Sequence, residues 1–197
     1  MKEDNPLYRF RYCPLCGSPR FLEHGEQARR CESCGFTYYT NPRGATVAVI
    51  VNDRDEMLVG VRENEPARGT LDLVGGFADL DETIEQTMCR EIREESGLVV
   101  REEDLRYLFS LPNTYPYSGI SVKTIDMFFE LRLQGRPDLE GMDDISTLRW
   151  IPISGLKVEE FGLTSVRKGV ERYLQGIRGG GGPTLKAHGD DNLNTNT

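Results

Sequence analysis

The chain has 197 residues, enough for one ordinary domain or for one domain with a small satellite. Apolar residues make up 38% of the sequence and charged residues 28%, so a core of normal size can form and wholesale disorder is excluded. The net charge of −8 disfavours non-specific attraction of nucleic acid. If the chain handles phosphates, local Arg and Lys side chains or a divalent cation must neutralise them.

The sequence lacks the apolar segments that are typical of membrane and secreted proteins. Its longest apolar run, residues 45–51, is far shorter than the roughly 20 residues that span a bilayer. The first six residues have no apolar segment of the kind found in secretion signals. We therefore expect a cytoplasmic protein that makes no membrane contact.

Composition divides the chain into three zones. Residues 8–42 hold four of the five cysteines and are predicted to form a small separate unit. Residues 43–177 alternate apolar stretches with polar turns and are predicted to form the main domain. Residues 178–197 contain few large aliphatic side chains, and we expect a disordered tail because they bury too little apolar surface to offset the entropy of ordering.

The first zone contains two Cys-x-x-Cys-Gly knuckles, formed by Cys13, Cys16, Cys31 and Cys34. Two intervening residues let both thiolates of a knuckle bind one tetrahedral ion, and the glycine that follows permits a left-handed backbone. The pattern predicts a structural Zn²⁺ site in a zinc ribbon. The alternative is a pair of disulfides, which requires an oxidising compartment. The ribbon either stabilises the neighbouring domain, which the short link at residues 41–44 favours, or docks nucleic acid or protein through its arginines.

Strands interrupted by two helices are predicted in the second zone, which favours an α/β (α+β) sandwich. The first two strands are expected to form a hairpin across an Asn-Asp-Arg-Asp turn. The expected strands cover residues 46–51, 57–61, 71–74, 105–111, 121–133 and 148–151. The expected helices cover residues 84–96 and 165–175.

The helix at residues 84–96 has a defined start and end. Thr83 followed by Gln86 fits a capping box, and Gly97 is a natural C-terminal stop. At about 100° per residue, Glu91, Glu94 and Glu95 share one sector away from the apolar stripe.

Three carboxylates on one helical sector allow two interpretations. They are a solvated charge run compensated by Arg90 and Arg93, or they are ligands for Mg²⁺ or Mn²⁺, which prefer carboxylate oxygens. A divalent ion at this helix would also neutralise a phosphate substrate on an acidic protein.

The residues around this helix resemble the Nudix box at every specified position. The pattern reads Gly76, five residues, Glu82, seven residues, Arg90-Glu91-Ile92, one residue, Glu94-Glu95, one residue, Gly97-Leu98. The resemblance implies an α/β/α sandwich with a mixed sheet. It also implies hydrolysis, with Mg²⁺ or Mn²⁺, of a nucleoside diphosphate linked to another group, such as NADH or ADP-ribose.

The resemblance assigns roles to individual residues. Glu91, Glu94 and Glu95 would be metal ligands, and Glu82 would be an additional carboxylate near the metals. The main-chain carbonyl of the Gly75–Gly76 turn joins the coordination sphere in several family members, which makes Gly76 a candidate ligand. Arg90 would orient Glu91 or its neighbours. The general base is left open between Glu91, Glu94 and an acid outside the box, Asp143 or Asp144.

A four-cysteine ribbon directly before such a domain resembles the NADH pyrophosphatase branch of the family. That branch carries a Ser-Gln-Pro-Trp-Pro-Phe-Pro motif shortly after the box. Residues 105–119 of this chain share its serine, prolines and aromatic residues, but they lack the tryptophan and have a longer spacing. The identity of the substrate therefore stays open.

Five further residues are candidates for substrate binding. Tyr115 and Tyr117, held apart by a proline, could stack on a base, or they cover the core at a strand edge. Phe77 is either a substrate wall or a core residue. Arg62 and Arg68 could pair with phosphates. We expect selectivity to lie in loops at residues 62–70 and 112–120.

Other functions remain as alternatives. A non-catalytic Nudix module could sense a nucleotide metabolite, although such modules usually lose box carboxylates and all are present here. An isomerase on the same fold would act on a prenyl diphosphate, and the ribbon could itself be a docking module. The expected partner is a small nucleotide-type substrate, nucleic acid is disfavoured by the charge, and a homodimer is possible.

Overall fold

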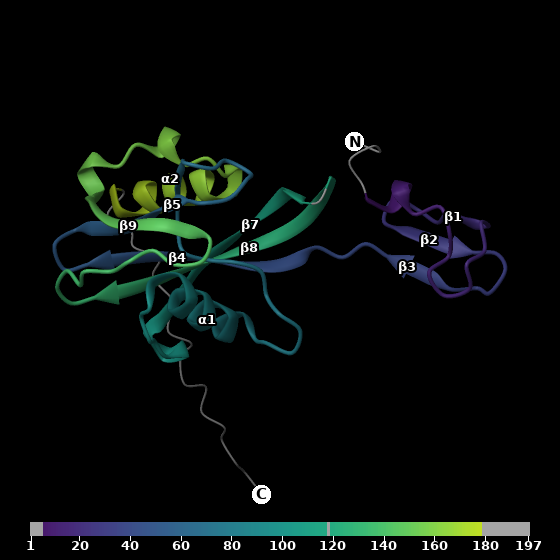
Figure 1. Cartoon of the computed structure of the whole chain (residues 1–197), viewed down its shortest axis with the longest axis horizontal. Coiled ribbons are helices and arrows are strands. Elements are labelled where there is room, and N and C mark those ends of the chain that lie inside the picture. Colours follow the sequence, from purple (N-terminus) through teal and green to yellow (C-terminus); the bar gives the residue numbers. More distant parts are fainter. Residues whose placement is uncertain (1–5, 118, 179–197) are drawn as a thin grey trace, which may run out of the picture.

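The computed structural model describes residues 6–117 and 119–178, which form a small N-terminal ribbon and a larger sandwich (Figure 1). The predicted tail at residues 178–197 begins at the last residue of helix α2 (Thr164–Arg178) and otherwise lies outside the described residues. Within the described part, no helix is long and apolar enough to cross a membrane.

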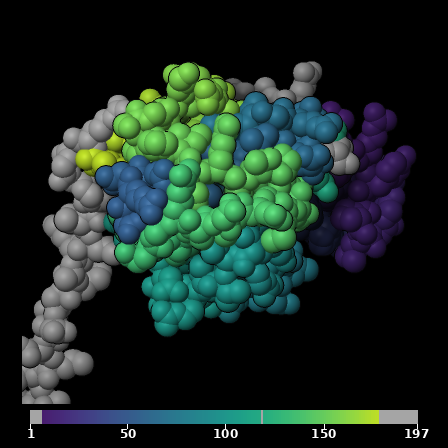
Figure 2. Space-filling model, turned by 60° about the vertical axis from the view of Figure 1, so that its left-hand side comes forward, coloured from purple at the N-terminus to yellow at the C-terminus, as the bar shows by residue number. Residues whose placement is uncertain are grey.

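The ribbon is a three-stranded antiparallel sheet built from short strands. These are β1 (Phe21–Glu23), β2 (Ala28–Cys31) and β3 (Thr37–Tyr39). Phe21, Cys13 and Cys31 are buried together and form a core separate from those of the sandwich. Figures 1 and 2 both show the ribbon (purple) as a lobe to one side of the remaining chain.

The sandwich contains a mixed sheet of six strands in the order β6-β5-β4-β8-β7, with β9 paired to β5. Strands β4 and β8 are parallel, and the other pairs are antiparallel. The strands are β4 (Arg43–Asn52), β5 (Glu56–Arg62), β6 (Leu71–Asp72), β7 (Leu105–Tyr117), β8 (Ile120–Leu133) and β9 (Ile145–Pro152). The expected hairpin between the first two of these strands is confirmed by the pairing of Val51 with Met57.

Helices α1 (Ile84–Ser96) and α2 (Thr164–Arg178) cover opposite faces of the sheet (Figure 1). Alternate residues of β4 point to opposite faces, so that Val47 and Val49 pack on the α2 side and Ala48 and Ile50 on the α1 side. The predicted three-layer sandwich with a mixed sheet is therefore confirmed.

The main departure from expectation lies in β7, which continues to Tyr117 instead of ending near residue 111. The expected loop at residues 112–120 is thus largely strand, and Tyr117 pairs with Ile120 at the tip of a hairpin. Proline lacks the N–H that a ladder needs, but it is tolerated in an edge strand. Strand β7 is at the edge of the sheet, which accommodates Pro112 and Pro116.

Candidate functional site

The four cysteines of the ribbon converge on one point. All their sulfur atoms lie within 4.8 Å of one another, and they are the one such group of metal-binding side chains found in residues 6–117 and 119–178. The Sγ atoms of Cys13 and Cys34 are 3.7 Å apart, and those of Cys16 and Cys31 are 3.6 Å apart. A tetrahedral ion with Zn–S bonds of about 2.3 Å requires sulfur separations of about 3.8 Å. The cluster therefore fits a structural zinc, and all four cysteines are free thiols.

The knuckle glycines adopt the conformation that their spacing predicts. Gly17 and Gly35 have φ angles of 71° and 78°, in the left-handed region that favours glycine. Burial raises the pKa of Cys31, but the N–H groups of Cys34 and Ser33 outweigh it and lower the pKa to about 6. At Cys31 the backbone therefore stabilises a thiolate, the form that binds zinc. At Cys16 the Ser18 N–H lowers the pKa, but hydrogen bonding with Cys34 and burial outweigh it and raise the pKa of that thiol.

Helix α1 begins and ends where its capping signals predict. Thr83 accepts a hydrogen bond from the Gln86 backbone, the Gln86 side chain accepts one in return, and Gly97 ends the helix with φ 72°. Of the three glutamates, Glu91 and Glu95 are buried and Glu94 is exposed. The fixed start of the helix sets the direction in which these carboxylates point.

Arg90 links the acidic residues of the helix to the loop that precedes it. Its Nη1 lies 2.8 Å from Glu91 Oε1 and 2.9 Å from Glu94 Oε2. Its Nε donates to Glu82 at 2.9 Å, and its Nη2 donates to the Phe77 carbonyl at 3.0 Å. One guanidinium thereby positions three box carboxylates and the backbone of the glycine-rich turn.

The Gly75–Gly76 turn approaches the helix too closely for side chains. The Gly75 N–H donates to Glu95 Oε2 at 2.9 Å. A Cβ atom on Gly76 would lie 2.3 Å from Glu91 Oε1, and one on Gly75 would lie 2.1 Å from the Thr46 carbonyl. The two glycines allow the turn to reach the carboxylates, which is the contact that the box pattern implies.

Burial and pairing set the charge states at this site. Burial raises the pKa of Glu91, and it raises the pKa of Glu95 to about 9. The Arg90 guanidinium, assisted by Thr87, lowers the pKa of Glu82 to about 2. Buried carboxyl groups that have few cationic partners within the protein are suitable ligands for a divalent ion. Hard ions of this kind prefer oxygen ligands. The residues present therefore fit Mg²⁺ or Mn²⁺.

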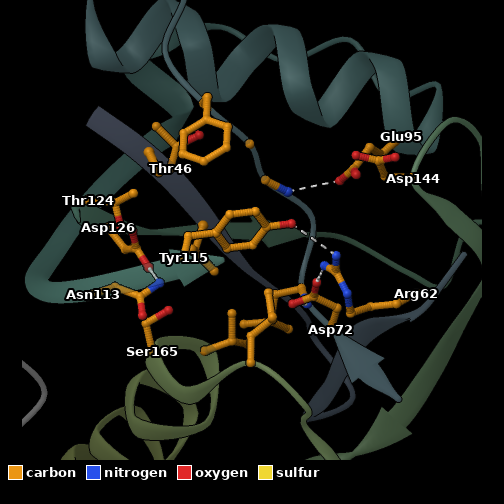
Figure 3. Close-up of a pocket in the computed structure, with 18 residues that line it drawn as sticks. Thr46, Arg62, Asp72, Glu95, Asn113, Tyr115, Thr124, Asp126, Asp144 and Ser165 are labelled. Atoms are coloured by element: carbon orange, nitrogen blue, oxygen red, sulfur yellow. Dashed lines mark hydrogen bonds and ion pairs between the residues drawn. The ribbon is translucent and has the colours of Figure 1, made fainter. Parts of the chain in front are cut away.

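A pocket of about 110 Å³ opens beside this acidic cluster (Figure 3). Six of the candidate residues line it: Gly76, Glu95, Phe77, Arg62, Tyr115 and Asp144. The other box residues do not line it. Neither do two of the substrate-binding candidates: Arg68 is exposed with its nearest ion-pair partner at 3.6 Å, and Tyr117 is exposed at the hairpin tip. The phosphate and stacking contacts suggested for those two residues stay predictions.

Arg62, a candidate for pairing with phosphate, has its partners inside the protein. It is buried, forms an ion pair with the buried Asp72, and lies 3.5 Å from the Tyr115 hydroxyl (Figure 3). Its charge is thus balanced inside the protein, and it fixes Tyr115 in the pocket wall.

Phe77 forms part of the pocket wall with partners on two sides. The Arg43 guanidinium lies 4.5 Å from its ring centroid, and the Tyr115 ring meets it edge to face at 5.5 Å. Both aromatic residues are therefore held in place by protein contacts.

Sequence reasoning missed several polar residues of the pocket: Thr46, Asp72, Asn113, Thr124, Asp126 and Ser165. One signal was available, because Thr124, Asp126 and the buried Phe128 alternate along β8 and share a face. An acid at an inward-facing strand position is unusual and marks a polar site. No local pattern marks Ser165, which comes from the first turn of α2.

The acid pair outside the box lies at the rim of the same site. Asp144 lines the pocket and accepts a hydrogen bond from Asn64 at 2.8 Å. Asp143 has a φ angle of 53°, uncommon for a residue other than glycine. The Met142 N–H donates to the Glu95 carbonyl at 3.2 Å, which ties this loop to the end of α1.

The model of the NUDIX domain family matches residues 41–172, and that of the NADH pyrophosphatase zinc ribbon domain matches residues 9–39. The chain belongs to the Nudix family. Its curated relatives include the NAD-capped RNA hydrolase NudC of Edwardsiella ictaluri, 36% identical over 108 residues, or 55% of this chain and 40% of the relative. The NudC of Deinococcus radiodurans is 28% identical over 171 residues, or 85% of this chain and 58% of the relative. The chain spans about half the length of the curated relatives it matches.

Solved Nudix structures share the fold. A NUDIX hydrolase from Nitrosomonas europaea superposes with a TM-score of 0.65 at 20% identity, covering 87% of this chain and 94% of that one. The NUDIX domain of Shewanella oneidensis NrtR, solved with ADP ribose, superposes with a TM-score of 0.57 at 20% identity, covering 71% and 90%. Together with the described sheet and helices, these similarities confirm the Nudix sandwich. The family match at residues 9–39 and the cysteine cluster confirm the zinc ribbon that precedes it.

Proposed function

We propose that this chain is a divalent-metal-dependent pyrophosphohydrolase that cleaves a nucleoside diphosphate linked to another group. The observation that carries this proposal is the meeting of the box carboxylates with the Gly75–Gly76 turn at the edge of a pocket. Within the family, NAD-linked compounds are the leading candidates because the curated relatives are named NAD-capped RNA hydrolases and the ribbon is of the NADH pyrophosphatase type.

Glu91, Glu94 and Glu95 are the proposed holders of the metal, with the Gly76 carbonyl and Glu82 nearby. When bound, Mg²⁺ or Mn²⁺ would polarise the phosphate and lower the pKa of the attacking water. Arg90 keeps Glu91 and Glu94 in position, and the Gly75 N–H holds Glu95. These contacts reduce the reorganisation that the site needs when it binds substrate.

The residue that takes the proton from the attacking water stays open among three acids. Glu91 and Glu94 are candidates on the helix, and Asp144 is a candidate because it lines the pocket beside Glu95 (Figure 3). Asp143 does not line the pocket and is the weaker of the two acids outside the box.

The zinc ribbon is proposed to be structural, with four thiolates filling the coordination sphere. Its separate core and its position to one side of the sandwich also leave its faces available for a docking role. The minimal substrate is proposed to be a small nucleotide.

Product analysis of a substrate panel tests the proposed reaction. The panel holds NADH, NAD⁺, ADP-ribose, a diadenosine polyphosphate, a nucleotide sugar, nucleoside triphosphates and an NAD-capped RNA, each with Mg²⁺ or Mn²⁺. We expect mononucleotide products from one class and at least a hundredfold loss of rate in Glu94→Gln and Glu95→Gln, since removing groups that act in the transition state costs about this much. Tight binding of one compound without cleavage would contradict the proposed enzyme activity and support the alternative of a non-catalytic metabolite sensor.

A further inference from the structure

Arg43 lies where the zinc ribbon, the central sheet and the glycine-rich turn come together. It is the first residue of β4, and its guanidinium carbon lies 4.5 Å from the centroid of the Phe77 ring. Arg43 is exposed and does not line the pocket, whereas Phe77 does. Arg43 is also outside the box pattern, so its contact with a pocket residue needs a separate explanation.

The position of the Phe77 ring depends on few contacts. The ring is half-buried and belongs to neither of the two hydrophobic core clusters of the sandwich. It is contacted by the Arg43 guanidinium and by the Tyr115 ring, which meets it edge to face at 5.5 Å. Because no core encloses the Phe77 side chain, removal of either neighbour should increase its rotamer freedom.

The backbone joins Arg43 to the same glycine-rich turn. The residues that follow Arg43 in β4 pair with the residues that follow the turn. The Ala78 N–H donates to the Gly44 carbonyl at 3.0 Å, and Ala45 faces Phe77 in an antiparallel bridge. A change at the start of β4 therefore reaches the turn through the backbone and through the Arg43 side chain.

The connection between the ribbon and Arg43 is short and stiff. At the end of the ribbon, the Thr40 N–H donates to the Gln27 carbonyl at 2.8 Å. Only Asn41 and Pro42 separate Thr40 from Arg43. Proline fixes its own φ angle and restricts the preceding residue to extended conformations. The orientation of the ribbon therefore influences the start of β4.

A second contact holds the ribbon against the sandwich. The 3₁₀ helix η1 (Pro6–Arg9) lies close to β8, whose hairpin with β7 extends toward the ribbon in Figure 1. Arg29 of β2 donates to the Leu7 carbonyl at 3.0 Å and thereby ties η1 to the ribbon sheet. Attachment at two places restricts rotation of the ribbon about the link to β4.

The ribbon is too small to keep this orientation without its metal. Its core consists of Cys13, Phe21 and Cys31, with Phe36 packed against them. Units of fewer than about 40 residues usually need a metal or disulfides to fold, and metal binding then supplies the folding free energy. Loss of zinc should therefore remove the support that the ribbon gives to the start of β4.

We propose that Arg43 is a positioning residue through which the zinc-loaded ribbon holds Phe77 and the glycine-rich turn in the pocket wall. The four cysteines then influence substrate binding, although they lie outside the pocket. The effect on substrate binding rests on the proposed function, whereas the effect on the order of the turn does not.

Hydrogen exchange of the full-length protein tests this connection without a substrate. Cys31→Ser and Arg43→Ala should each speed exchange of the Ala78 amide about two- to fivefold, the value of one exposed cation–π contact. Arg172→Ala is the matched control, because Arg172 lies 4.3 Å over the Phe109 ring, outside the pocket, and should leave the Ala78 amide unchanged. Unchanged exchange of Ala78 in either test variant would overturn the proposal.

A further variant keeps the test decisive if Cys31→Ser unfolds the sandwich. Pro42→Gly retains the zinc ligands and Arg43 but makes the link flexible, because glycine has the widest choice of backbone conformations. It should also speed exchange of the Ala78 amide while zinc content stays at about one ion per chain. Wild-type exchange in Pro42→Gly would show that the link does not transmit the orientation of the ribbon.

Steady-state kinetics with NADH and ADP-ribose separate positioning from catalysis. Arg43→Ala should raise KM about two- to fivefold with little change in kcat, and Arg43→Lys should recover part of the loss because an ammonium also interacts with a ring face. The double variant with Cys31→Ser should be no worse than the more impaired single variant, since both changes act through one contact. Additive effects, or a fall in kcat at unchanged KM, would contradict the assignment.

The two proposals can fail separately. If no panel compound is hydrolysed but Ala78 exchange responds to Cys31→Ser and Arg43→Ala, the enzyme activity is removed and the connection stays. Hydrolysis of a panel compound with Ala78 exchange unaffected by both variants would keep the enzyme and remove the connection.

Discussion

The Arg90 guanidinium donates a hydrogen bond to Glu91 across 2.8 Å, although the two residues are consecutive in helix α1. Consecutive helical side chains do not normally face each other. The contact is possible because Glu82 and the Phe77 carbonyl hold the other edges of the guanidinium fork. A planar group with five donors in fixed directions can make these contacts together, whereas an ammonium cannot.

Replacing Arg90 with lysine tests this positioning role. Arg90→Lys keeps the positive charge but cannot hold Glu82, Glu91 and Glu94 together, so we expect about a 10- to 100-fold loss of kcat or of Mn²⁺ affinity. Steady-state kinetics and Mn²⁺ titration measure the two effects. Arg93→Lys is the matched control, because Arg93 is exposed on the same helix. Wild-type values in Arg90→Lys would show that charge alone suffices.

The glycine-rich turn makes a second prediction. Gly76→Ala places a Cβ atom 2.3 Å from Glu91 Oε1, so either the turn or the carboxylate must move. We expect a loss of about 1–3 kcal/mol in the free energy of unfolding, typical of overpacking. We also expect Mn²⁺ binding to weaken.

A glycine in helix α2 provides the comparison for that variant. Nothing lies within 4 Å of a Cβ atom built on Gly176. Gly176→Ala should therefore be neutral or stabilising by up to about 1 kcal/mol, since alanine is the better helix former. Denaturant unfolding of both variants checks the contrast, and equal effects would remove the steric argument.

We expect the zinc ribbon to unfold on loss of zinc while the sandwich stays folded. Cys31→Ser removes one of four ligands, and we expect the zinc content to fall from about one ion per chain to near zero. Because the ribbon has its own small core, hydrogen exchange should increase in residues 8–42 while β4 and β8 stay protected. Elemental analysis and exchange measurements report the two effects. Loss of protection throughout the chain would show that the ribbon stabilises the whole fold.

The titration of Glu130 is expected to make the free energy of unfolding depend on pH. Burial raises the pKa of Glu130, but hydrogen bonds from Tyr173, Arg132 and Arg106 outweigh it, and the net pKa is below the usual value. A carboxylate with a depressed folded pKa stabilises the protein above its unfolded pKa of about 4.3 and loses that contribution as the pH falls through the folded pKa.

Thermal unfolding of the wild type and of Glu130→Gln between pH 7 and pH 3 tests this behaviour. We expect the wild type to be more stable near pH 7, with the gap narrowing below about pH 4.3. Both proteins share the ribbon, so loss of zinc in acid affects both equally and cancels in the comparison. A gap that stays constant down to pH 3 would show that Glu130 is not the titrating group.

Local patterns accounted for the parts of this protein that depend on near neighbours in sequence. The start of α1 follows from the Thr83–Gln86 capping box, and its end follows from Gly97, because both signals act within one helical turn. The cysteine knuckles likewise combine two ligands and a left-handed glycine within five residues. The Nudix resemblance rests on spacing of this kind.

Local sequence patterns gave the wrong or an incomplete expectation where a strand's place at the edge of the sheet, or a partner distant in sequence, decides the conformation. The prolines in residues 112–117 indicate a loop when read locally, but pairing with β8 continues β7 through them at the sheet edge. Arg62 was expected to be able to pair with a phosphate, and only the fold shows that β6 brings Asp72 to it and buries the pair.

The sequence by itself determined the family, the zinc knuckles and the acidic helix, because each is encoded by residue types at short fixed spacings. Only the tertiary structure decided which residues line the pocket. Thr46, Asp126 and Ser165 come from β4, β8 and α2, and they meet because the parallel pairing of β4 with β8 and the packing of α2 bring distant segments together. Such contacts depend on the whole fold, so no local spacing encodes them.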